Sequence, residues 1–368
     1  MEKIGILTFW GVPNYGAFAQ AYALNKVVKK IMPNSKVVDL AYLHPQHTAL
    51  YFHNRRPKLQ SYKQLFSLSF YKQWVSYFIN RKNEYQEFVV DWNSIPHVDI
   101  KDEKKLEKYK CDIIVTGSDA IWEYSIPEFG NDVHLIGNHL RCDKLISYAA
   151  SFGDMNEDDF FADFVLEGLN KYDMISVRDF TSKQIIQKLI GEKKVDIVLD
   201  PSLLYDFRND EEIPKAKYNN YVLVYGDNFS DKLIHDVKNY ARENGLTIIG
   251  AGIAPEWCDI CLREIGPKEW IGLFKDAEMV VTCTFHGLMF SINFEKKVVF
   301  NQVNYVKNRS EYLLKMLGLN QLYTENVDSI LQNVLDFKWD YNEINIKLDE
   351  MREKSMAYLR KGLQYEKC

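Results

Sequence analysis

The 368-residue sequence lacks any run of about 20 apolar residues, the length that a membrane-spanning helix requires. Its start, MEKIGILTFW, lacks a basic region followed by a long apolar stretch, so it predicts a strand rather than a secretory signal. We therefore expect no membrane span and a cytoplasmic protein. Cysteine is also scarce, with 6 in the chain, and in the cytoplasm these thiols are expected to stay reduced. Only Cys258 and Cys261 form a CxxC pair, which gives two of the four usual zinc ligands, so no metal site is predicted.

Acidic residues are missing from one long interval, although the formal net charge of the chain is -5. None occurs between Asp39 and Glu84, where basic residues alternate with aromatic ones. The basic residues of this interval are Arg55, Arg56, Lys58, Lys63, Lys72, Arg81 and Lys82. Such a segment is typical of a solvated helical face, of a helix on the inner face of an anionic membrane, or of a subdomain facing an anionic substrate. The overall charge does not indicate nucleic-acid binding.

Short apolar stretches alternate with helical patterns in both halves of the chain, which predicts an α/β protein with two parallel sheets. Residues 1–207 form the first predicted Rossmann-like domain, with a basic helical insertion at about 51–92. The polar stretch 208–220 is the predicted linker, and 221–340 form the second Rossmann-like domain. A charged helix over 341–368 is expected to pack back on the first domain. Ligands of such sheets bind beyond the carboxyl ends of the strands, so the predicted site is a cleft between the two domains.

Four loops with reactive or turn-forming residues follow predicted strands. They are Asn14-Tyr15-Gly16, Gly117-Ser118-Asp119, Ser176-Val177-Arg178-Asp179 and Thr284-Phe285-His286-Gly287. The last lies in MVVTCTFHGLMF, where an apolar strand runs into a helix. A helix N-terminus lowers the pKa of a histidine and attracts anions, so His286 is a candidate for proton transfer near neutral pH. Lys307 and Arg309 lie in a predicted loop before a helix, where an external anion is a favourable partner.

Each candidate also has a purely structural interpretation. His286 could be a hydrogen-bonded core residue, and Arg178 could form an ion pair with Asp179 or Asp200 instead of binding a carboxylate or phosphate. Ser118 and Asp119 could cap a helix instead of binding sugar hydroxyls. The coincidence of all four loops at strand ends favours a binding site.

The segments NYGAFAQAYAL, VTGSDAIW, SYAASFG, ISVRD, VLDPSLL and VVTCTFHGLMFSINFEKKVVF, in this order, resemble the polysaccharide pyruvyl transferase family. The resemblance covers about residues 3 to 320. It implies a GT-B-like fold with two Rossmann-like domains facing a cleft. It also implies transfer of pyruvate from phosphoenolpyruvate, as a co-substrate and without a cofactor, to hydroxyls of a cell-surface polysaccharide or its lipid-linked precursor. The product is a pyruvate ketal.

The resemblance assigns catalysis to His286 and Arg178. His286 is expected to act as a general acid or to stabilise the leaving phosphate, and Arg178 to hold the carboxylate or phosphate of the donor. The predicted substrate-binding residues are Asn14, Tyr15, Gly16, Ser118, Asp119, Thr284, Phe285, Gly287, Lys307 and Arg309. Of these, Asn14, Tyr15, Ser118 and Asp119 are expected to line the cleft toward the acceptor, and Asp119 could act as a base.

One position departs from the family pattern, because Cys283 stands where the family has an acidic residue next to the histidine element. Two other functions therefore stay open at this point. One is a GT-B glycosyltransferase that uses a nucleotide sugar, and the other is a non-catalytic glycan-binding or scaffold protein of a polysaccharide assembly complex.

Overall fold

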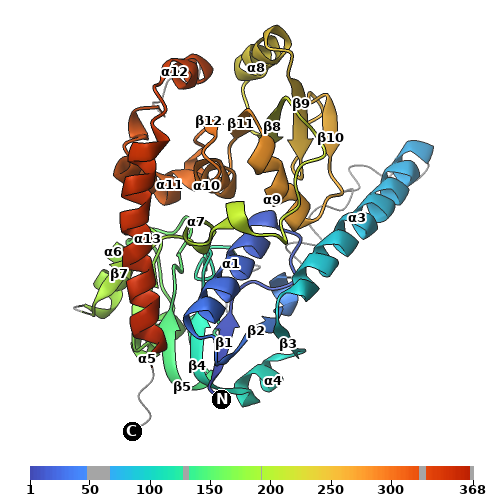
Figure 1. Cartoon of the computed structure of the whole chain (residues 1–368). Coiled ribbons are helices and arrows are strands. Elements are labelled where there is room, and N and C mark those ends of the chain that lie inside the picture. Colours follow the sequence, from blue (N-terminus) through green and yellow to red (C-terminus); the bar gives the residue numbers. More distant parts are fainter. Residues whose placement is uncertain (48–66, 127–131, 192, 323–328, 365–368) are drawn as a thin grey trace.

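The computed structural model describes residues 1–47, 67–126, 132–191, 193–322 and 329–364 and contains two parallel sheets of five strands each. The two sheets form two domains, one above the other in Figure 1. Residues 51–66, the first part of the predicted basic insertion, lie outside the described residues.

The N-terminal domain is built on the sheet β3-β2-β1-β4-β5, whose strands all pair in parallel. Its strand residues are mostly buried, as expected for a sheet that helices cover on both faces. A two-stranded parallel sheet, β6-β7, continues beside β5. The elements of this domain are β1 (Lys3–Leu7), α1 (Tyr15–Ile31), β2 (Lys36–Tyr42), α3 (Leu68–Ser94), β3 (His97–Ile100), α4 (Glu103–Lys108), β4 (Lys110–Thr116), β5 (Arg141–Ser147), α5 (Asp163–Lys171), β6 (Ile175–Val177), α6 (Phe180–Ile190), β7 (Val195–Ile197), α7 (Pro201–Leu204) and the 3-10 helix η2 (Phe207–Asn209).

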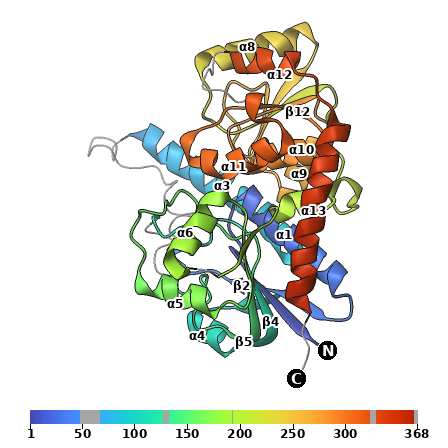
Figure 2. The same ribbon diagram turned by 90° about the vertical axis from the view of Figure 1, so that its left-hand side faces the viewer.

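The C-terminal domain repeats this plan with the sheet β10-β9-β8-β11-β12. Figure 2 shows α8 and α12 side by side at its outer end. Its elements are β8 (Tyr221–Tyr225), α8 (Asp231–Glu243), β9 (Thr247–Ala251), β10 (Ile260–Leu262), α9 (Pro267–Asp276), β11 (Met279–Thr282), α10 (Phe285–Asn293), β12 (Lys297–Phe300), α11 (Asn304–Leu317), the 3-10 helix η3 (Asn320–Leu322) and α12 (Ile330–Asp336).

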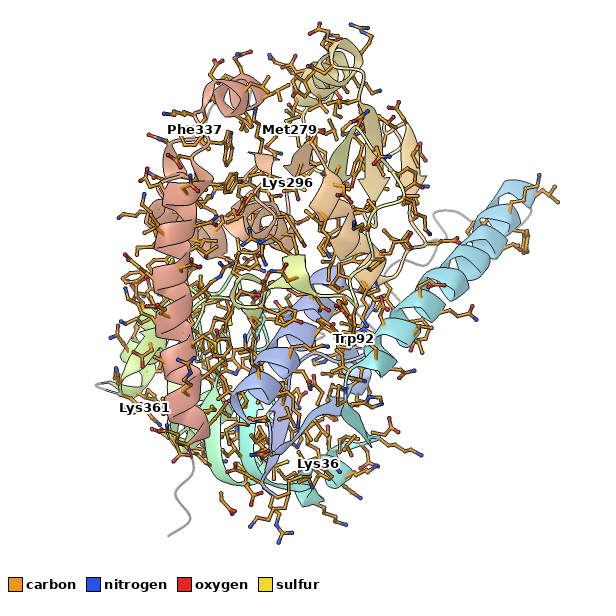
Figure 3. All side chains as sticks on the ribbon, viewed as in Figure 1. Lys36, Trp92, Met279, Lys296, Phe337 and Lys361 are labelled. Carbon is orange, nitrogen blue, oxygen red and sulfur yellow. The ribbon has the colours of Figure 1, made fainter. Side chains whose placement is uncertain are left out.

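The carboxyl ends of the two sheets face each other across the middle of the molecule. Lys36, at the amino end of β2, and Met279, at the amino end of β11, lie toward opposite ends of the molecule in Figure 3. The loops that follow the strands of both sheets therefore meet at the seam between the domains. This is where open α/β sheets bind their ligands.

The seam is closed by aromatic packing that joins both domains into one core. The Tyr15 ring of α1 lies 5.1 Å from the Trp270 ring of α9, and the Phe207 ring lies 5.1 Å from that of Phe290 in α10. All four side chains are at least nine-tenths buried. Ring pairs at this separation add stability beyond their buried area, so these contacts help to fix one domain against the other.

The last helix, α13 (Tyr341–Leu363), runs along both domains (Figures 1 and 2). Phe337, just before it, lies beside the C-terminal domain, and Lys361 lies beside the N-terminal domain (Figure 3). Leu359 and Leu363 are fully buried in a cluster with Ile4, Ile6 and other N-terminal core residues. The Tyr358 hydroxyl donates to the carbonyl oxygen of Ser147 at 2.8 Å. The charged terminal segment thus packs on the first domain.

Helix α3 projects from the body of the molecule (Figure 1). Trp92, near its C-terminal end, is buried beside α1 and donates from Nε1 to the Val12 carbonyl oxygen at 3.0 Å. At its other end, Leu68, Tyr71 and Val75 are more than half exposed. No helix within the described ranges is long and apolar enough to cross a membrane.

Candidate active site

His286 lies at the first turn of α10, directly after β11. Thr284 caps this helix, because its side-chain oxygen accepts from the Gly287 amide at 3.0 Å. Gly287 is required for this turn, since a Cβ there would lie 2.2 Å from Oγ1 of Thr282. The Thr282 hydroxyl in turn donates to the Tyr225 carbonyl oxygen at 2.7 Å. Thr284 and Gly287 therefore build the strand-to-helix turn that fixes the position of the imidazole.

The imidazole crosses the seam and packs on Gly16 of the N-terminal domain. A Cβ at position 16 would lie 2.1 Å from His286 Nδ1 and 2.5 Å from Cγ. Gly16 belongs to the first turn of α1, so the N-terminal ends of α1 and α10 meet at this point. The ring is 12% exposed, and its Nε2 atom has no hydrogen-bond partner among the described residues.

A buried group of charges from the N-terminal domain faces the imidazole. Arg178 donates from Nη1 to Asp200 Oδ2 at 2.9 Å and from Nη2 to Asp119 Oδ1 at 3.0 Å. The same Asp200 oxygen lies 4.0 Å from His286 Nε2. The Arg178 guanidinium also lies 4.7 Å from the centre of the Phe285 ring, which brings the two domains into contact once more.

Asp200 is held in place by hydrogen bonds to both of its oxygens. Oδ2 accepts from the Ser118 hydroxyl at 3.1 Å, and Oδ1 accepts from the Ser202 amide at 3.0 Å. Ser118 itself is fully buried, and its amide donates to Gln20 Oε1 of α1 at 3.0 Å. Ser118 therefore positions a carboxylate and does not cap a helix.

Burial and neighbouring charges shift the pKa values of His286 and Asp200. Burial lowers the pKa of His286, and the Arg178 and Arg309 charges act in the same direction, against the opposite effect of Asp200 and Asp119. Burial alone would raise the pKa of Asp200, but the charge of His286 in its protonated form, the Arg178 guanidinium and the hydrogen bonds of Ser202 hold that pKa below its ordinary value. Near neutral pH these directions favour a neutral imidazole beside an ionised carboxylate, which the Arg178 guanidinium binds.

Lys307 and Arg309, the two cations that the sequence predicted to bind substrate, differ in their environment. Arg309 of α11 reaches the N-terminal domain, where Nη2 binds Asp154 Oδ1 at 2.9 Å and lies 3.9 Å from Glu123 Oε2. Its Nε atom is buried without a hydrogen-bond partner in the part of the chain that the structure describes. Lys307 is exposed on the same helix.

Asn14 and Tyr15 form the edge of the seam beside Gly16. The Asn14 side chain caps α1 by accepting from the Ala17 amide at 3.1 Å. The Tyr15 hydroxyl donates to the Ile265 carbonyl oxygen at 3.1 Å, and its ring lies against Gly252, whose φ of +66° and close ring contact both favour glycine. Tyr15 thus contacts both domains.

The structure brings all four predicted loops together and adds a residue that the loops alone did not reveal. Asp200 was considered only as an ion-pair partner of Arg178, yet it also lies next to His286. The signal was present in VLDPSLL, where an aspartate follows a strand. Cys283, in contrast, is fully buried against Gly226 inside the C-terminal domain. The carboxylate beside the imidazole therefore comes from the other domain. Within the described ranges, no group of three or more His, Cys, Asp or Glu side chains could hold a metal ion.

The family model for polysaccharide pyruvyl transferase matches residues 14–300. The protein belongs to the polysaccharide pyruvyl transferase family. This membership implies a transferase that acts on polysaccharide, and the matched range contains His286, Arg178, Asp119 and Asp200. None of the curated proteins compared with the chain matches it.

Several solved structures share this fold at low sequence identity. Staphylococcus aureus MnaA in its complex with UDP has a TM-score of 0.50 at 10% identity, over 95% of this chain and 91% of that one. UDP-GlcNAc 2-epimerase of Methanocaldococcus jannaschii, with UDP-GlcNAc and UDP, has a TM-score of 0.47 at 11% identity, over 97% and 100%. The spinosyn rhamnosyltransferase SpnG has a TM-score of 0.44 at 11% identity, over 98% and 99%. The predicted GT-B-like fold, with two Rossmann-like domains facing a cleft, is confirmed.

Proposed function

We propose that this family member transfers the pyruvyl group of phosphoenolpyruvate to two hydroxyls of a glycan or of its lipid-linked precursor. The first sugar hydroxyl gives up its proton, which passes to the methylene carbon of the donor, so that an oxocarbenium-like centre forms as the freed sugar oxygen approaches. One sugar oxygen attacks this centre, phosphate departs, and a second sugar oxygen attacks to close the ketal. Of the two hydroxyl protons, one ends on the new methyl group and the other on the released phosphate, so donor and diol give ketal and phosphate.

One observation carries this proposal: in a family member, an imidazole whose Nε2 has no hydrogen-bond partner among the described residues lies in the interdomain seam beside buried Asp200. A neutral imidazole first accepts a proton and then returns it. We therefore assign His286 the transfer of the first hydroxyl proton to the methylene carbon. This differs from a general acid that is already protonated in the resting enzyme. The carboxylate of Asp200 stabilises the imidazolium that exists between the two steps.

The buried guanidinium has a different role in this scheme from the one expected from the sequence. Both Nη atoms of Arg178 already bind carboxylates. We propose that Arg178 holds Asp119 and Asp200 toward His286 and that Arg309 binds the anionic groups of phosphoenolpyruvate. Arg309 has a single close ion pair, with Asp154 at 2.9 Å, and an unpartnered Nε among the described residues. Lys307, exposed on the same helix, can supply a second positive charge near the mouth of the site.

Helix α3 is the candidate for membrane contact, which a lipid-linked acceptor would require. Leu68, Tyr71 and Val75 recur at helical spacing and are exposed on its projecting end, and Lys72 is exposed beside them. An apolar stripe with adjacent basic residues can lie in the interface of an anionic bilayer. Sedimentation with vesicles of phosphatidylglycerol should bring down the protein, and replacing all three apolar residues with serine should leave it in the supernatant.

The proposed reaction is tested by incubating the protein with phosphoenolpyruvate and a panel of lipid-linked sugars while phosphate release is measured. His286→Ala should abolish release, and its melting temperature, measured in parallel, shows whether the variant still folds. Phosphoenolpyruvate should raise the melting temperature of the wild type, because a ligand that binds the folded state stabilises it. A rise with UDP-sugars and none with phosphoenolpyruvate would instead favour a nucleotide-sugar glycosyltransferase.

A further inference from the structure

A cavity opens at the same seam, beside Tyr15, the residue that precedes Gly16. It has a volume of about 400 Å³, which falls within the range of small-molecule sites. From the N-terminal domain it is lined by Asn14 and Tyr15, and from the C-terminal domain by Tyr225, Asp227, Gly252 and Arg263, among others. These residues of the C-terminal domain lie at or just beyond the carboxyl ends of β8, β9 and β10, where an α/β sheet binds its ligand.

The backbone connects this cavity directly to the imidazole. Tyr15 precedes Gly16, which the His286 ring contacts. On the other side, the carbonyl oxygen of Tyr225 accepts from Thr282, the last residue of the strand that leads to His286. The cavity therefore neighbours, along the chain, both the Gly16 contact and the strand that leads to His286, although His286 itself does not line it. A ligand there would not occupy the place proposed for the donor, because neither Arg178 nor Arg309 lines this cavity.

The charges of the cavity decide the class of ligand. Asp227 and Arg263 contribute one negative and one positive charge among its lining residues, so the cavity offers no excess of positive charge for a diphosphate. Asp227 is exposed, and its carboxylate forms no hydrogen bond or ion pair within the described residues. Arg263 is oriented by Nε and Nη2, which donate to the Ala254 carbonyl oxygen at 3.3 and 3.2 Å. A free carboxylate and a fixed guanidinium are well suited to hydroxyl groups, which both donate and accept.

We infer that this cavity binds the acceptor as an uncharged sugar ring, a hexose or an N-acetylhexosamine, with Asp227 and Arg263 as specificity-determining residues. This inference rests on the proposed function, since it places the diol of the ring toward His286. Asp227 accepts from ring hydroxyls that do not react, and the Asn14 side chain lies at the rim of the same cavity. The Asp227 carboxylate disfavours a nucleoside diphosphate in this cavity.

The test measures binding without phosphoenolpyruvate, so that it does not depend on the reaction. Methyl glycosides of neutral hexoses and N-acetylhexosamines are added to the wild-type protein, and binding is followed by saturation-transfer NMR. At least one glycoside should bind, and Asp227→Asn should weaken its binding by about tenfold or more, since a carboxylate acceptor is lost. Glu256→Gln is the matched control, because Glu256 is an exposed carboxylate of the neighbouring loop that does not line the cavity, and it should leave binding within twofold.

The inference is overturned if no glycoside binds, if Asp227→Asn binds as the wild type does, or if UDP displaces the glycoside. His286→Ala should retain glycoside binding, which separates this site from the reaction. Glycoside binding that depends on Asp227, together with no phosphate release from phosphoenolpyruvate, would support the cavity and refute pyruvyl transfer. If phosphate is released and Asp227→Asn leaves the KM for the acceptor unchanged, acceptor binding in this cavity is refuted and pyruvyl transfer is supported.

Discussion

Gly16→Ala tests whether the imidazole must lie in its observed position. The new Cβ would lie 2.1 Å from His286 Nδ1, 2.5 Å from Cγ and 2.6 Å from Cε1. Carbon contacts are normally about 3.5–4.0 Å, so the ring has to move by more than about 1 Å. A displacement of this size at a reacting group costs on the order of a hundredfold in rate. We expect the rate of phosphate release to fall by about that factor.

The effect on stability should be much smaller than the effect on rate. Gly16 lies in the first turn of α1 without a positive φ, so alanine suits its backbone and favours the helix by up to about 1 kcal/mol. This gain opposes an overpacking cost of about 1–3 kcal/mol. The melting temperature should therefore change by only a few degrees while turnover collapses.

Removing the ring provides the control for Gly16→Ala. In a His286→Ala background the clash is absent, so adding Gly16→Ala should leave the stability unchanged or slightly increase it. The free energies of unfolding of the two single variants and the double variant, measured in urea, give the coupling between the two positions. Turnover of Gly16→Ala within threefold of the wild type, or a coupling near zero, would refute the reasoning.

Three further predictions concern buried or shared charges. Burial raises the pKa of Asp39 to about 8, from an ordinary value of 3.8. Between these two pH values the folded protein keeps a proton on Asp39 that the unfolded chain has lost. The free energy of unfolding should therefore fall as the pH rises through this range, by at most about 1.4 kcal/mol per pH unit. Asp39→Asn should flatten this slope in urea unfolding from pH 5 to 8, and parallel slopes would contradict it. Asp200→Asn leaves the buried guanidinium of Arg178 with one carboxylate, which should lower the free energy of unfolding by about 3–5 kcal/mol. It also removes a negative charge that raises the pKa of His286, so the acidic limb of the pH profile of kcat/KM should move to lower pH. An unshifted limb would argue against the proposed action of Asp200 on His286. Arg309→Gln should raise the KM for phosphoenolpyruvate about tenfold or more. The melting temperature should change little, since a partly exposed ion pair contributes about 1 kcal/mol or less to stability. The control is Lys217→Gln, which removes an exposed ion pair with Glu269.

Local patterns in the sequence were enough to predict the framework. The alternation of apolar strands and helices depends on residues close in the chain, so it indicated both parallel sheets and the loops beyond their strands. Two edge strands, β3 and β10, were missed because they are only 4 and 3 residues long and are partly exposed. In such short segments the pattern of buried positions is too brief to distinguish a strand from a loop.

Residue types at the strand ends indicated which loops meet at the seam between the domains but not how their side chains pair. That His286 follows β11 could be read from the chain, because a strand running into a helix is a local feature. That its imidazole rests on Gly16, and that Asp200 of the other domain lies beside it, depends on the packing of one domain against the other. The engagement of both Nη atoms of Arg178 likewise joins residues that are 59 and 22 positions apart. The sequence by itself thus determined the family, the two sheets and the strand-end loops, since these follow from neighbours in the chain. Only the tertiary structure decided which carboxylate faces the imidazole and where a sugar-sized cavity opens, because both arise from contacts between distant segments.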